Sequence, residues 1–118
     1  MARDRWHLIH EEDGALTLAR RRPARFDLAV EGRLPEASRT RVAHRVRQDM
    51  WRALRHLRGF APVVRVWHVP GGLQVRAGGA VAGRFAREEA EARIAALFDD
   101  PARVARWTGR GPAGGGAR

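Results

Sequence analysis

Histidines and carboxylates are the side chains of this sequence that could transfer a proton, and its many arginines could stabilise an anion. Nucleophiles are scarce, because cysteine, lysine and tyrosine are absent and the single serine, Ser38, stands where a helix start would use it as a cap. A metal-independent nuclease that uses two histidines and an arginine is chemically possible, around His68 and Arg65 or around His44 and Arg41. No spacing supports it specifically, so we expect a protein that is not an enzyme.

The spacing of the histidines also argues against a metal site. His7 and His10 are three residues apart on an expected strand, where such residues point to opposite faces. His44 and His56 are twelve residues apart on an expected helix, too far to bind one ion. The glycines form neither a phosphate-binding loop followed by lysine nor a dinucleotide-binding pattern. We therefore expect no metal and no cofactor.

The strongest candidate binding surface is the polar side of a long helix in the middle of the chain. Residues 34–60 carry seven arginines against two acids, whereas a solvated helix usually interleaves glutamates that pair with its basic residues. At about 100° per residue, five polar side chains fall within one stripe opposite the apolar positions. They are Arg41, Arg45, Gln48, Arg52 and Arg55. Such a stripe can follow the phosphates of a nucleic acid or dock on an acidic protein, and an ordinary solvated helix face is the plain alternative.

A second candidate surface is one face of a hairpin around Pro70-Gly71, a pair that fits the centre of a type II turn. In the register that this turn sets, Arg65 and Arg76 lie directly opposite each other with Trp67 beside them. Two arginines and an indole on an exposed sheet face resemble a stacking platform for single-stranded nucleic acid. The alternative is that a helix or another subunit covers this face.

The C-terminal stretch adds positive charge, because residues 101–118 hold no acid and four arginines, which are Arg103, Arg106, Arg110 and Arg118. We expect either a mobile basic arm that adds non-specific affinity for nucleic acid or an unselected solubilising tail. Residues 109–118 are Gly-rich without periodicity and are expected to be disordered. A single domain is expected over residues 1–108.

Three strands are expected ahead of the long helix. Residues 6–11 and 15–20 flank an Asp-Gly pair, which is a strong hairpin signal. Alternating apolar residues indicate a third strand over residues 25–31, ended by Gly32. The helix follows, with Pro35 in its first turn.

The helix is expected to end just before Gly59, and further elements follow it. These are strands over residues 63–69 and 73–77, a loop or weak edge strand over 78–83, a helix over 85–98, and a short helix that Pro101 opens and Trp107 anchors. The order β-β-β-α-β-β-α plus a short terminal helix predicts an α+β fold. Its simplest form is one largely antiparallel sheet with the helices packed on one face.

Charge and composition bear on whether this protein contacts a membrane and on its cellular compartment. The net charge is +10, and no apolar stretch approaches the ~20 residues needed to cross a bilayer, so we expect no membrane partner. The first residues lack the apolar run of a signal peptide, and the lack of cysteine suits a reducing compartment, so we expect a cytoplasmic protein.

The leading hypothesis is a small basic module that binds nucleic acid, DNA or RNA, non-specifically through its arginine-rich helix face. The alternative is an interaction or assembly subunit that docks on an acidic protein or associates with itself as a homo-oligomer.

Overall fold

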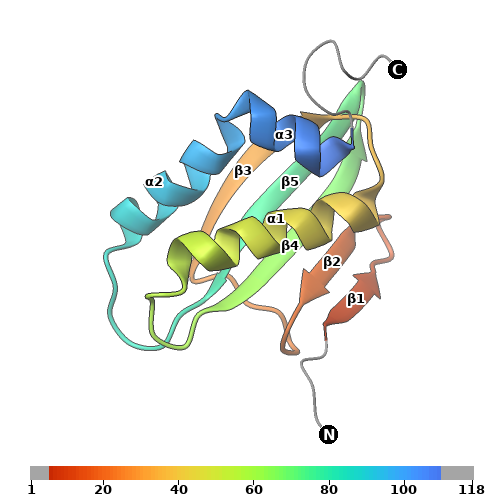
Figure 1. Cartoon of the computed structure of the whole chain (residues 1–118). Helices are drawn as coiled ribbons and strands as arrows, with labels where there is room; N and C mark the ends of the chain where they lie inside the picture. The colour runs from red at the N-terminus through yellow and green to blue at the C-terminus, as the bar shows by residue number, and fades with distance from the viewer. Residues whose placement is uncertain (1–5, 110–118) are drawn as a thin grey trace, which may run out of the picture.

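Five antiparallel strands carry three helices on one face of the sheet within residues 6–109, the part of the chain that a computed structural model describes (Figure 1). The strands are β1 (His7–His10), β2 (Leu16–Ala19), β3 (Leu28–Pro35), β4 (Ala61–Val69) and β5 (Gly72–Ala80). The helices are α1 (Arg39–Leu54), α2 (Arg87–Phe98) and α3 (Pro101–Thr108). The predicted α+β class, the order of the elements and the placement of the helices on one face are confirmed.

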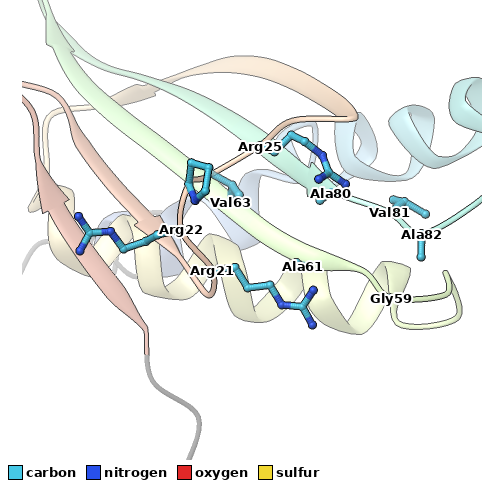
Figure 2. Close-up of a pocket in the computed structure, with 10 residues that line it drawn as sticks. Arg21, Arg22, Arg25, Gly59, Ala61, Val63, Ala80, Val81 and Ala82 are labelled. Atoms are coloured by element: carbon cyan, nitrogen blue, oxygen red, sulfur yellow. The ribbon is translucent and has the colours of Figure 1, made fainter.

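The strands lie in the order β1-β2-β4-β5-β3, so that β1 and β3 form the two edges of the sheet. β2 and β3 follow each other in the sequence but lie on opposite sides of the β4–β5 hairpin. Residues 20–27, which we name the crossing loop, therefore pass over both hairpin strands on the face that the helices leave free (Figure 2). We name that face, with Arg65, Trp67 and Arg76 on it, the outer face of the sheet.

The hydrophobic core lies between the inner face of the sheet and the helices. Alternate residues of the central strands point to the helices and are fully buried, among them Leu16, Val64, Val66, Leu73 and Val75. α1 covers them with a side formed by Val42, Ala43, Val46, Met50 and Leu54. A side chain of leucine or methionine size contributes ~1.5–3 kcal/mol when fully buried, so these contacts fix the orientation of α1. The polar side of α1 must then face away from the sheet.

The β4–β5 hairpin has the predicted register. Arg65 is paired with Arg76 and Trp67 with Gln74, in an antiparallel ladder that runs the length of both strands. Gly71 takes a φ of 83°, the left-handed conformation that the third residue of a type II turn requires. The arginines and the tryptophan therefore share the outer face, as the sequence predicts.

The third strand lies further along the chain than predicted. β3 spans Leu28–Pro35, so the prediction of residues 25–31 with an end at Gly32 is wrong. Gly32 lies inside the strand, where an added Cβ would meet the Phe98 ring of α2 at 2.5 Å, and only glycine leaves room for that ring. Pro35 is the last residue of this edge strand instead of part of the helix, a position where a missing N–H is tolerated.

The long helix is shorter than predicted at both ends. Ser38 is its N-cap and accepts a hydrogen bond from the Arg41 N–H at 3.2 Å, which agrees with the capping role expected of that serine. α1 ends at Leu54, and turns rather than helix lead on to Gly59, which has the positive φ of 63° expected of a chain reversal. The stripe residue Arg55 is therefore the C-cap of the helix.

Of the stretch 78–83, expected to be a loop or a weak edge strand, residues 78–80 lie inside the sheet as part of β5 and residues 81–83 form a loop. β5 continues to Ala80 and lies between β4 and β3. An added Cβ at Gly78 would clash with the Leu28 carbonyl oxygen of β3, so the absence of a side chain permits the close approach of the two strands. From the sequence alone the small residues indicated a loop or a weak strand, whereas in the structure they allow β3 and β5 to pack closely.

Two further predictions concern the C-terminal tail and membrane-spanning helices. Gly109 ends α3 in the left-handed conformation, and the other residues of the expected disordered tail lie outside the described range. Between residues 6 and 109 no helix has both the length and the apolar character that crossing a membrane requires.

Candidate nucleic-acid interface

The predicted stripe lies on the solvent side of α1. Its members Arg41, Arg45, Gln48, Arg52 and Arg55 are all exposed, whereas the opposite side of the helix is buried against the sheet. The guanidinium groups of Arg41 and Arg55 have no hydrogen-bond or ion-pair partner among residues 6–109. These two positive charges are therefore open to an external anion.

Helix α3 lies along α1 and adds two more arginines to the stripe (Figure 1). The Arg45 Nη1 donates to the carbonyl oxygen of Arg106 at 2.5 Å, which ties the two helices together. Arg103 and Arg106 belong to this ordered helix, so their assignment to a mobile arm is wrong, while Arg110 and Arg118 lie outside the described residues. The two basic segments of the sequence thus meet on one surface.

A buried carboxylate holds this junction in place. Asp49 on α1 is only 6% exposed and accepts hydrogen bonds from Trp107 Nε1 at 2.8 Å and from Arg106 Nη2 at 2.7 Å. Arg103 Nη1 lies 3.2 Å from the same carboxylate oxygen. A buried charge must be paired, and this one is paired with two arginines of the neighbouring helix. Asp49 therefore works as an internal clamp, and its single negative charge is shared among Arg52, Arg103 and Arg106.

Trp107 explains why the clamp is stable. Its side chain is fully buried and packs edge-on against Phe98, with 5.2 Å between the ring centroids. Asp100 caps α3 by accepting from the backbone N–H groups of Ala102 and Arg103, and Pro101 opens the helix as predicted. The anchoring role predicted for Trp107 is confirmed, and its partner Asp49 is the residue that sequence reasoning missed.

We define the α1–α3 basic face as the surface formed by seven residues, of which Arg103 is half-buried and the others exposed: Arg41, Arg45, Gln48, Arg52, Arg55, Arg103 and Arg106. Part of it forms a groove of about 540 Å³ between the helices, lined by Gln48, Asp49, Arg52, Ala53, Leu97, Arg103 and Arg106. Within the described residues, the carboxylates that contact its six arginines are Asp49 and Asp100. The face thus keeps a surplus of positive charge.

The second predicted surface, on the outer face, has a different charge balance. Arg65 lies opposite Arg76, as predicted, but its Nη2 is 2.5 Å from Asp13 and its Nε is 3.3 Å from Glu11. Arg76 Nη1 lies 3.6 Å from Glu31 on β3. These three acids come from distant parts of the sequence and offset both arginines, including the repulsion expected between them.

The aromatic part of this surface is also engaged. The Arg65 guanidinium lies 4.9 Å from the centre of the Trp67 ring, and that of Arg76 lies 5.0 Å from the ring of Phe26 in the crossing loop. The Ala15 N–H, which donates to Asp13 at 3.0 Å, holds the pKa of that carboxyl below its usual range, and Arg65 adds to this effect. No helix of residues 6–109 covers this face, which removes one of the alternatives considered from the sequence.

The histidines do not gather into a reactive group. His68 lines a hollow of about 400 Å³ with Asp13, Arg65 and Trp67, and no second histidine lines it. The Nδ1 of His68 lies 3.5 Å from Glu36. Burial lowers the pKa of His44 on α1, with a further contribution from a neighbouring arginine. Between residues 6 and 109, no group of three or more histidines and carboxylates could hold a metal ion.

Comparisons of the chain with protein-family models, with curated proteins and with solved structures found no match.

Proposed function

We propose that this protein binds the backbone of nucleic acid through the α1–α3 basic face, with little base specificity. The observation that carries the proposal is the charge of that face, where six arginines converge from two helices and the best-paired carboxylate, Asp49, is buried beneath them. Each arginine that neutralises a phosphate releases condensed counterions, which is the main source of non-specific affinity for DNA and RNA.

The geometry favours phosphates over bases as the contacted groups. The arginines are spread along two packed helices, and the groove between them is lined mainly by polar side chains. Such an arrangement suits a repeating line of charge, which a sugar–phosphate backbone supplies. Arg65, Trp67 and Arg76 form a weaker, secondary surface in this proposal, because nearby acids offset their charge.

The decisive measurement is fluorescence anisotropy with labelled single- and double-stranded DNA and RNA across a salt series. Affinity should fall steeply with salt, because the slope of log K against log salt reports the number of phosphate contacts, about 0.9 per contact on B-DNA. The double variant Arg52→Gln/Arg55→Gln should reduce that slope by about two and weaken binding at low salt.

A matched control comes from the double variant Arg84→Gln/Arg87→Gln, which removes the same charge from exposed positions outside the α1–α3 basic face. It should leave the salt slope unchanged. Equal losses in both double variants would mean that only the net charge matters, and an absence of binding at low salt would refute the proposed function.

An acidic protein is the alternative partner for the same face, since the groove also includes the apolar side chains of Ala53 and Leu97. Association through such a mixed surface would resist salt more than phosphate binding does. Salt-resistant self-association in sedimentation experiments, or salt-resistant capture of a folded acidic protein, would favour this alternative.

A further inference from the structure

A separate hollow lies on the outer face, at the end of the sheet where β4 begins and β5 ends. Its volume is about 260 Å³, just below the ~300–1,000 Å³ typical of pockets for drug-sized molecules. The crossing loop forms one side, and the segment around Ala82 that follows β5 forms the other (Figure 2). The hollow therefore suits a small molecule rather than a polymer.

The floor of this hollow is apolar and made of small residues. It is formed by Gly59, Ala61, Val63, Ala80 and Val81, and Ala82 continues the apolar lining onto the side wall. Ala61, Val63 and Val81 are each buried to more than nine-tenths, so the floor belongs to the rigid end of the sheet. Small side chains leave the hollow unfilled, and they offer an apolar body van der Waals contact without a competing polar group.

The rim is positive. The crossing loop places Arg21, Arg22 and Arg25 around the hollow, and no carboxylate lines it. Figure 2 shows Arg25 beside Ala80 at the end of β5 and Arg21 beside Ala61 at the start of β4, whereas Arg22 points away from both strands. Arg21 is exposed and makes no ion pair or side-chain hydrogen bond within residues 6–109. Arg22 is likewise exposed and without such a partner within these residues, so Arg21 and Arg22 both carry uncompensated charge at this site.

Arg25 is held in position by its neighbour. Its Nε and Nη2 donate to the two carboxylate oxygens of Asp27, at 3.2 and 3.0 Å, which leaves Nη1 for another acceptor. Asp27 is itself fixed, because it accepts from the Val81 N–H at 2.8 Å and its own N–H donates to Gly79 at 2.7 Å. These bonds fasten Arg25 and the loop to the end of the sheet, so this part of the rim is preorganised, whereas the exposed side chain of Arg21 becomes ordered on binding.

We propose that this hollow binds a small organic anion, a phosphate or carboxylate group joined to a compact apolar body. Arg21 binds the anionic group with help from Nη1 of Arg25, since guanidinium groups match the oxygens of both anions. The apolar body lies on the floor between Ala61 and Ala82. This site is separate from the α1–α3 basic face, which lies on the helix side of the sheet, and the proposal does not depend on nucleic-acid binding.

The test is a titration of the isotope-labelled full chain with phenyl phosphate, followed by NMR. The phosphate should shift the backbone amides of residues 21–27, and the ring should shift the methyl groups of Ala61, Ala80, Val81 and Ala82. Inorganic phosphate should bind at least several-fold more weakly, because it lacks the part that contacts the floor. Phenol should leave the spectrum unchanged at the same concentrations.

The variant Arg21→Ser should weaken phenyl phosphate about tenfold, the loss expected for a charge-assisted hydrogen bond. Arg84→Ser is the matched control, since it removes an exposed arginine that does not line the hollow, and it should bind as the unmodified chain does. An unchanged two-dimensional amide spectrum away from the loop shows that each variant is folded.

Three results would overturn the proposal. They are equal affinity for phenyl phosphate and inorganic phosphate, equal affinity of the Arg21→Ser and Arg84→Ser variants, and shifts confined to the α1–α3 basic face. A fourth arm distinguishes a free ligand from a nucleic-acid phosphate: the affinity for an oligonucleotide should be the same with and without Arg21→Ser. A loss there would assign the loop to the polymer-binding surface instead.

Discussion

The α1–α3 basic face and the outer face of the β4–β5 hairpin carry the same kind of residue but end with opposite charge balances. On the helices, arginines from two basic segments converge, and their main carboxylate partner is buried. On the sheet, Arg65 and Arg76 attract Glu11, Asp13 and Glu31 from other strands and loops. A local excess of arginine is therefore not enough to identify a binding surface, because the tertiary fold decides which acids come near.

The largest effect is expected from removing the carboxylate beneath the basic face. Asp49→Ala leaves the indole N–H of Trp107 and two arginines without their acceptor, so we expect about 3 kcal/mol of lost stability in urea unfolding. The control Asp99→Ala, at the exposed C-cap position of α2, should change stability by less than about 0.5 kcal/mol. Similar losses in the two variants would mean that Asp49 is not the clamp between α1 and α3.

Removing acids from the outer face should give it a surplus of positive charge like that of the α1–α3 basic face. The double variant Glu11→Gln/Asp13→Asn removes the two acids that offset Arg65, so the outer face gains an open basic and aromatic platform. If nucleic acid binds as proposed, affinity should rise by up to about fivefold at low salt, which corresponds to an exposed ion pair of ~1 kcal/mol. Anisotropy measures the change.

Glu88→Gln/Glu89→Gln on α2 is the matched control, because it removes two exposed acids from a distant element. If this control raises affinity as much as Glu11→Gln/Asp13→Asn does, the outer face is not a latent binding platform and only net charge is being measured.

The smallest expected effect is on the pH dependence of stability, and it comes from His44 on α1. Burial holds the pKa of His44 on α1 below its ordinary value of 6.5, so the folded state resists a proton that the unfolded chain accepts. The contribution that neutral, buried His44 makes to the free energy of unfolding is fully present above pH 6.5 and declines as the pH falls below it. His44→Gln should flatten the dependence of the unfolding free energy on pH below 6.5, which urea unfolding at a series of pH values measures.

Local patterns predicted the parts of the fold that local forces determine. The turn at Pro70-Gly71 sets the register of β4 and β5, and the spacing of Val42, Val46 and Met50 determines which side of α1 meets the sheet. The extension of β3 through Gly32 was not predictable in this way, because it depends on the Phe98 ring that packs over that glycine from α2.

The candidate sites, too, have features that local sequence patterns predict and features that depend on tertiary contacts. Exposure of the α1 stripe follows from helix periodicity alone, whereas the Asp49–Trp107 bond joins residues 58 positions apart and leaves no local trace. Arg20, Arg21 and Arg22 are consecutive in the sequence, but acids elsewhere in residues 1–33 nearly balance the charge of that segment. The structure adds that this run of arginines lies on a loop that crosses the outer face of the sheet.

The end of α3 has a practical consequence for experiments on this protein. Gly109 closes the helix beside the guanidinium group of Arg41, where even a methyl group added to the glycine would touch Nη1. An affinity tag fused directly after Gly109 would therefore start next to the α1–α3 basic face. An acidic epitope there would compete with a polyanion for the same charges, so immobilisation through the other terminus is the better choice for measuring binding.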